Sequence, residues 1–390
     1  MNFSEKRNNR LVTIIISAFF SFFIFFWGVS FNFIQFRFLI FLLIIPILLN
    51  FNKKVLNKCI KYFFIIFLLF LHIFFQSNNF VFSNLFHLIG LFLLLLIFDI
   101  YKSFFFNNLD KIVNIFLINL FLYIILSVIF FDNYFETISN NCIGCFSILK
   151  QFFKENSHFG MMSVPTLFYL FFISKTNVTL RFIFLFLFIL LVYFNQSLTF
   201  VAGTIILIFC ISFIFFEKKK KSFILFLIIS LILIFNKNTF TQNVKVKDIF
   251  LKTEQINLSS EVYKASFFVA QKAIFNKPLG YGFNKYHEAH EEFINDFNPY
   301  HKIVLELNKQ DGSTNFAKIV TEFGVFSLIY FYFLIVFFLN KKIDNKMKIF
   351  FITPLLIETF IRGAGYFNGG FLLFFIFAIF LSSEKNLKTQ

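Results

Sequence analysis

The stretch Phe19-Phe20-Ser21-Phe22-Phe23-Ile24-Phe25-Phe26, close to the start of the chain, indicates the fold class. Similar runs recur along all 390 residues, 76 of which are phenylalanine. With 58% apolar and only 14% charged residues, the chain departs from water-soluble proteins, which average roughly half apolar and a quarter charged. A protein core cannot hide this much apolar surface from water, so lipid must surround it. The sequence predicts an all-α integral membrane protein.

About twelve apolar stretches are candidates to cross the ~30 Å of bilayer hydrocarbon, a distance that takes roughly 20 helical residues. We expect these spans near residues 11–29, 36–51, 62–76, 83–99, 112–131, 159–174, 180–194, 197–216, 222–235, 317–339, 349–362 and 370–383.

The basic residues between these spans predict their orientation. Lys and Arg accumulate in short cytoplasmic connections. If the N-terminus is cytoplasmic, 21 Lys and Arg residues fall in the inner segments and only four in the short outer ones. Both termini are therefore expected in the cytoplasm. The net charge of +16 comes from basic residues that lie in short clusters between the apolar stretches. This placement indicates membrane orientation, so we expect no nucleic-acid partner.

Three regions follow from the spans: a transmembrane region at 1–235 with about nine spans and a small outer loop at 132–158, a large outer loop at 236–315, and a transmembrane region at 316–390 with about three spans. The large loop holds ten Lys and nine acidic residues. A segment this polar cannot lie in hydrocarbon, because its backbone groups would lack hydrogen-bond partners there. It is expected to form a mainly helical extracytoplasmic structure.

Local signals divide the large loop into elements. Ser259-Ser260-Glu261 is typical of a helix start, and that helix must end by Pro278. Gly280-Tyr281-Gly282 then predicts a sharp turn or a close approach of the backbone to a ligand, because glycine adopts positive φ without steric cost. The polar stretch Tyr286–Phe293 is expected to be helical.

Two pairs of opposite charges occur at helical spacing near the outer surface. Lys318 and Glu322 are four residues apart, as are Glu358 and Arg362, so each pair can meet on one helix face. Charges inside a span are costly and indicate function by default. The alternative is interfacial snorkelling, in which long side chains extend to water.

The order of motifs resembles the O-antigen polymerase and ligase superfamily of membrane glycosyltransferases. Lys264 precedes Gly280 by fifteen intervening residues, a spacing at which the polymerases often place Arg and Gly in one large outer loop. The segment 278–283 is similar to the family's Pro and Gly-x-Gly turn, and 315–327, with Glu322-Phe323-Gly324, is similar to its next span start. Ser313 and Thr314 stand where ligases generally carry His, and Leu198 stands where the family tends to carry Arg.

The resemblance implies extracytoplasmic polymerisation of polyprenyl-diphosphate-linked oligosaccharide units into an O-antigen-like or capsular polysaccharide. It also implies the bacterial inner membrane, with the large loop in the periplasm. A ligase that transfers glycan to lipid A core or another acceptor is the alternative enzyme. A lipid-linked glycan flippase or secondary transporter is the alternative of another class, although transporters tend to show two related halves. Expected partners are the lipid-linked oligosaccharide, the bilayer and other polysaccharide-assembly proteins.

Such chemistry needs cations for a diphosphate leaving group and a base for the attacking hydroxyl. Glu322 is the leading candidate for the base. No Walker-type phosphate loop occurs, and the His-Glu-x-His spacing at 287–290 differs from that of zinc proteases, so we expect no cofactor and no metal. The candidate cations are Lys264, Lys318 and Arg362, and the candidate substrate-binding residues are Gly280, Gly282, Lys272, His290, Asn315 and His158.

Overall fold

In the computed structural model, the regular elements of the described residues are helices, as predicted, apart from one short hairpin. The hairpin pairs β1 (Ser30–Phe31) with β2 (Ile34–Gln35) in antiparallel register. The structure describes residues 13–18, 20–21, 30–31, 34–35, 47, 52–76, 82–130, 166, 169, 203, 258–363, 365–366 and 371–383.

Helices α3 (Lys53–Gln76) and α4 (Phe82–Asn107) pack side by side. The expected span at 62–76 begins nine residues too late, because the helix already starts at Lys53. Its start is capped by Asn52, whose side-chain oxygen accepts hydrogen bonds from the next backbone N–H groups at 3.0 and 3.1 Å. A polar first turn with a good cap therefore extends the helix beyond its apolar stretch.

Aromatic packing holds the helical body together. The rings of Phe105 on α4 and Phe377 on α18 stack with centroids 3.7 Å apart, and Phe106 meets Phe351 on α17 at 6.1 Å. Close packing of this kind is what associates helices in lipid, where apolar surface alone gives little drive. The remaining body helices are α5 (Leu109–Phe130), α16 (Ser327–Leu339), α17 (Asn345–Leu356) and α18 (Phe371–Ser383).

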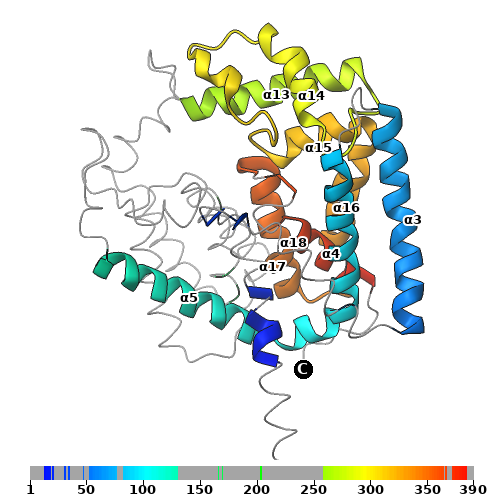
Figure 1. Ribbon diagram of the computed structural model, residues 1–390, viewed down its shortest axis with the longest axis vertical. Helices are drawn as coiled ribbons and strands as arrows, with labels where there is room; N and C mark the ends of the chain where they lie inside the picture. Colours follow the sequence, from blue (N-terminus) through cyan, green and yellow to red (C-terminus); the bar gives the residue numbers. More distant parts are fainter. Residues whose placement is uncertain are drawn as a thin grey trace, which may run out of the picture.

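Lysines gather at one end of this body, which we call the lysine end. Lys58 of α3 forms an ion pair with Asp99 of α4 at 3.3 Å, and Lys102 lies 5.8 Å from the ring centroid of Phe380 of α18. Figure 1 shows α5 leaving the body at this end. The lysine end carries Lys53, Lys54, Lys58, Lys61, Lys102, Lys111, Lys341, Lys342, Lys346 and Lys348.

Residues 258–314 form a polar cap across the opposite end of the body, where α13 and α14 lie over α3, α4 and α16 (Figure 1). The cap has its own core, which includes Val269, Tyr281 and Tyr286. The predicted helix start, the stop before Pro278 and the second helix are confirmed. The elements are α13 (Leu258–Asn276), α14 (Tyr286–Phe293), η3 (Ile294–Asp296) and η4 (Lys302–Glu306).

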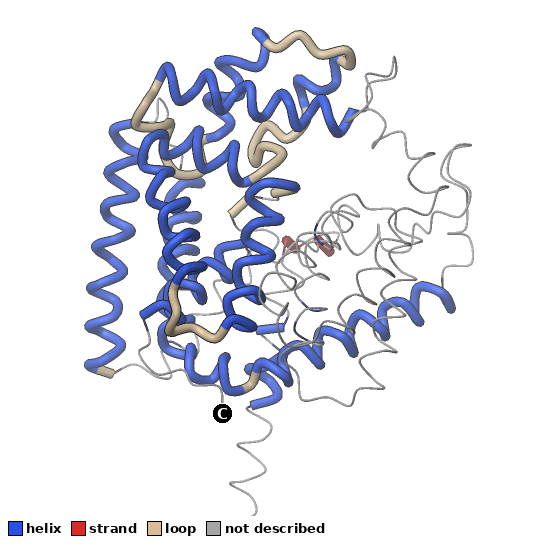
Figure 2. The backbone as a smooth tube through the Cα atoms, turned by 180° about the vertical axis from the view of Figure 1, so that it is seen from behind, coloured by secondary structure: helices blue, strands red, loops and turns tan. Residues whose placement is uncertain are grey.

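The expected single span at 317–339 consists of three pieces. It begins with α15 (Asn315–Phe323), passes through the 3-10 turn η5 (Gly324–Phe326) and continues as α16. The break falls at Gly324, whose φ of 53° combined with a ψ of −128° is unfavourable for residues with a Cβ atom. Near the same end, α17 runs into the π-helical turn η6 (Ile357–Ile361). Figure 2 shows the same arrangement from behind.

Three helices in the described part are long and apolar enough to cross a membrane: Lys53–Gln76, Asn84–Asn107 and Asn315–Leu339. They support a membrane protein, whereas the total of about twelve spans stays a prediction. The outer loop at 132–158 and the spans near 11–29, 36–51, 159–174, 180–194, 197–216 and 222–235 lie wholly or largely outside the described residues.

Candidate functional site

Two turns that the sequence singles out meet directly in space. The N–H groups of Tyr281 and Gly282 donate to the carbonyls of Thr321 and Glu322 at 3.1 and 3.0 Å. The approach is so close that a Cβ on Gly280, whose φ is 87°, would lie 2.2 Å from the carbonyl oxygen of Glu322. The predicted sharp turn is confirmed, and its backbone contact with α15 joins the cap to the span that follows it.

The Glu322 carboxylate is held by three donors. It accepts from the backbone N–H groups of Asn284 at 2.7 Å and Tyr286 at 3.1 Å, and from the Lys318 amino group at 3.2 Å. Asn284 has a φ of 59°, a conformation that Asn tolerates better than most residues. Glu322 thus fixes the path of the chain between the glycine turn and α14.

Lys318 forms the other half of this arrangement. Besides Glu322, its amino group donates to the carbonyl of Gln310 at 2.7 Å and to Asp311 at 3.3 Å. An ammonium group has three donors, so all three are used. The predicted Lys318–Glu322 pair is confirmed, and both side chains are 0% exposed.

This buried pair acts as a latch between cap and span. One partner holds residues 284–286 and the other holds 310–311, and both project from α15. Removing one partner of a buried pair leaves an uncompensated charge, at a cost of about 3–5 kcal/mol. The geometry assigns Lys318 and Glu322 a positioning role, because all three donors of Lys318 and three acceptor directions of Glu322 are already used within the protein.

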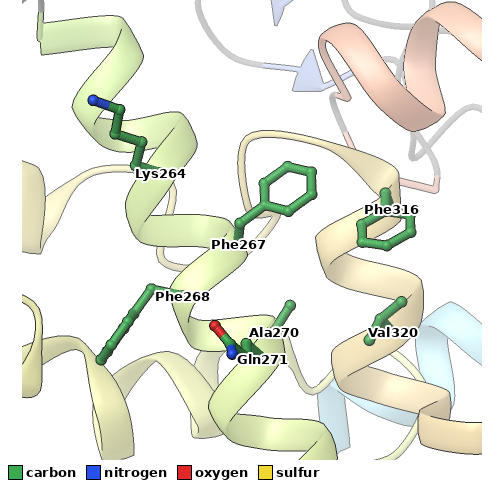
Figure 3. Close-up of a pocket in the computed structure, with 7 residues that line it drawn as sticks. All are labelled: Lys264, Phe267, Phe268, Ala270, Gln271, Phe316 and Val320. Carbon is green, nitrogen blue, oxygen red and sulfur yellow. The ribbon is translucent and has the colours of Figure 1, made fainter.

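An open groove of about 520 Å³ lies between α13 and α15. Figure 3 shows Phe267 and Phe316 facing each other across it, and their rings stack at 5.2 Å. Phe316 also meets Phe331 and Phe360, at 5.5 and 5.8 Å, so aromatic surface continues from the cap to the body. The groove is lined by Lys264, Phe267, Phe268, Ala270, Gln271, Phe316 and Val320.

Lys264, a candidate cation, stands exposed at the rim of this groove, and its amino group points away from Phe316 (Figure 3). Lys272, two turns later on α13, is also exposed and lies 5.6 Å from the ring centroid of Phe268. The two lysines are therefore reachable from water, in contrast to Lys318. An anionic group could approach them without dismantling the latch.

The remaining candidates occupy different settings. His290 is buried, and burial, with the nearby charge of Lys309, lowers its pKa to about 4. Asn315 begins α15 with a side chain that is 0% exposed. The φ of Gly282 is 103°, which suits the turn. His158 lies outside the described residues.

The predicted pairing of Glu358 with Arg362 is wrong. Both oxygens of Glu358 lack a hydrogen-bond partner in the described part of the structure. The expected pairing assumes the α-helical repeat, but η6 is a π-helical turn, in which the N–H of Arg362 bonds to the carbonyl of Ile357, five residues back. This wider turn rotates the side chains away from the α-helical alignment.

Glu261 makes contacts in the cap that its position in the sequence did not predict. Glu261, expected to stabilise the start of α13, also accepts from the N–H groups of Tyr300 and His301 and contacts the His301 ring at 2.8 Å. Burial pushes the pKa of Glu261 up, but the hydrogen bonds from His301 and these N–H groups outweigh burial and hold it below its ordinary value. The sequence placed Glu261 in the first turn of a helix but gave no sign of its contacts with Tyr300 and His301.

The arrangement as a whole gives a polar cap locked onto a span, with accessible lysines and an aromatic groove at the junction. Within the described residues, no three His, Cys, Asp or Glu side chains gather as they would to hold a metal ion. No known family model, curated protein or solved structure matches the chain.

Proposed function

We propose that this protein is an extracytoplasmic membrane glycosyltransferase that polymerises polyprenyl-diphosphate-linked oligosaccharide units into an O-antigen-like or capsular polysaccharide. In this proposal the protein resides in the bacterial inner membrane, with both termini in the cytoplasm and the cap in the periplasm. The supporting observation is the junction between cap and span. There, two motifs that suggested the family are in backbone contact beside a groove with a lysine at its rim.

The chemistry requires a headgroup to meet protein cations while its lipid stays in the bilayer. Lys264, and Lys272 in reserve, are accessible cations for the diphosphate, and Arg362 follows the π-turn at the same end of the body. Fixed positive charge stabilises the leaving group as the glycosidic bond breaks. Lys318 and Glu322 support the site by holding the cap in place.

The test is the length of surface glycan made by a deletion strain complemented with variants. Lys264→Ala should shorten or abolish long chains while the protein still inserts, because the leaving group loses a counter-charge. Lys302→Ala, which removes another exposed cap lysine, is the matched control and should keep wild-type chain lengths. Unchanged glycan in the deletion strain would overturn the proposed function, and unchanged glycan in Lys264→Ala alone would remove Lys264 from the site.

The same strain separates the alternatives by the intermediate that accumulates. A polymerase defect leaves single repeat units on the surface glycan. A defect in a ligase, which would transfer glycan to lipid A core or another acceptor, leaves long lipid-linked chains. A defect in a lipid-linked glycan flippase or secondary transporter leaves units trapped on the cytoplasmic side.

A further inference from the structure

Glu358, in the π-helical turn η6, is a buried carboxyl group without a partner. Its side chain is 0% exposed, and neither carboxyl oxygen accepts or donates a hydrogen bond in the described part of the structure. Nearly all buried polar groups in proteins are hydrogen-bonded, and an unpaired one costs free energy. The residue therefore brings no stability that would explain its presence.

The location of Glu358 independently points to function. It lies in one of the segments expected to span the membrane, where ionisable side chains indicate functional sites by default. The π-helical turn that carries it is a rare element, frequent at functional sites. Pro354, four residues earlier, lies inside α17 at the approach to this turn.

Further unused hydrogen-bonding capacity lies where η6 meets α15. The N–H of Gly363 donates to the carbonyl of Ser313 at 2.9 Å, and a Cβ on Gly363 would lie 2.7 Å from the side-chain oxygen of Asn315. Asn315 is 0% exposed, and neither atom of its amide has a partner among described residues. η6, which carries Glu358, packs against α15, which begins at Asn315, so both unpaired side chains belong to one pair of packed elements.

Glu322 and Glu358 differ in what they can still do. Three donors already hold the oxygens of Glu322, so a proton taken by this carboxylate would remove the charge that pairs with Lys318 and weaken the latch. Glu358 has both oxygens uncommitted. We propose that Glu358, and not Glu322, receives the proton of the attacking acceptor hydroxyl, with Asn315 orienting that hydroxyl; this assignment rests on the proposed function.

In the transfer step, the acceptor hydroxyl oxygen bonds to the anomeric carbon of the lipid-linked sugar. The bond between that carbon and the diphosphate oxygen breaks, and its electron pair leaves with the diphosphate. The hydroxyl proton passes to Glu358, which acts as a carboxylate only once the bound acceptor supplies the hydrogen-bond donor that its oxygens lack in the ligand-free protein.

The experiment measures chain elongation in membranes that contain full-length protein, with lipid-linked repeat units extracted from the deletion strain as the probe. Glu358→Gln keeps the shape but cannot take the proton, so its kcat should fall by about 10²–10⁴-fold with KM little changed. Glu358→Asp should recover part of the rate. Glu306→Gln, at a carboxyl that is 69% exposed in the cap, is the control and should match wild type.

Thermal melting distinguishes this role from a structural one. Glu358→Met replaces an unpaired carboxyl by an apolar side chain of similar size, so it should melt at or above the wild-type temperature while losing elongation. A lowered melting temperature for Glu358→Met, or wild-type kcat for Glu358→Gln, would overturn the assignment. If the deletion strain accumulates repeat units and Glu358→Gln still elongates normally, the assignment fails alone; if the strain accumulates none, the proposed function fails with it.

Discussion

The same kind of ion pair occurs at both ends of the helical body, in opposite surroundings. At the lysine end, the Lys58 and Asp99 side chains are 31% and 12% exposed, and Lys102 approaches the same carboxylate at 3.8 Å. At the cap end, Lys318 and Glu322 are both 0% exposed. The difference teaches that the ion pair at the lysine end stays partly solvated, whereas the ion pair at the cap end is fully buried and holds the cap on the body.

The largest effect is expected from Glu322→Ala. The substitution leaves the Lys318 ammonium buried without its span partner and the N–H groups of Asn284 and Tyr286 without an acceptor. We expect a loss of about 3–5 kcal/mol in the free energy of unfolding. Denaturant or thermal unfolding of the purified protein in detergent measures this loss.

The control for that experiment is the double variant Lys318→Met with Glu322→Met. It removes both charges together, so it should recover part of the stability that Glu322→Ala loses. If Glu322→Ala instead unfolds like wild type, the latch does not hold the cap.

A smaller, pH-dependent effect is expected from His290 in the cap. Burial, with the charge of Lys309, lowers its pKa to about 4, from an ordinary value of 6.5. The unfolded chain therefore binds this proton at a higher pH than the folded protein does. The contribution of neutral His290 to the free energy of unfolding is therefore complete above pH 6.5. It falls by about 2–3 kcal/mol as the pH decreases toward 4.

Melting temperatures measured between pH 7 and pH 4.5 test this statement. In His290→Gln the melting temperature should fall less steeply with falling pH than in wild type. The substitution removes a side chain that, in this pH range, binds a proton more readily in the unfolded chain than in the folded protein. Identical slopes in the two proteins would contradict the buried, neutral state of His290.

The smallest effect is expected from Lys58→Ala at the lysine end. The lost pair is partly solvated and Asp99 keeps Lys102, so the free energy of unfolding should fall by only about 0–1 kcal/mol. The same unfolding assay as for Glu322→Ala gives a direct comparison of the two ends. A loss as large as that of Glu322→Ala would erase the difference between them.

Local features of the cap were predictable because short-range rules determine them. The start at Ser259-Ser260-Glu261, the stop before Pro278 and the Lys318–Glu322 pair all follow from neighbours within four residues. The partners of that pair could not be predicted. Asn284 and Tyr286 precede Glu322 by 38 and 36 residues and reach it only through the path of the folded loop.

The unpaired state of Glu358 was missed for a related reason. Spacing alone cannot reveal that α17 ends in a π-helical turn, because the four-residue spacing of Glu358 and Arg362 assumes an α-helix. The sequence did indicate that a charge at this position needs explanation. What it could not supply was the identity of the groups around the carboxyl.

The two ends also provide the most direct test of the account, which requires them to face opposite sides of the inner membrane. In a variant that lacks the four natural cysteines, Tyr300→Cys probes the cap and Lys341→Cys the lysine end; both positions are exposed. With only the outer membrane permeabilised, an impermeant maleimide should label Tyr300→Cys, and Lys341→Cys only once the inner membrane is disrupted. The reverse pattern would put the cap in the cytoplasm and contradict its role in assembling exported glycan.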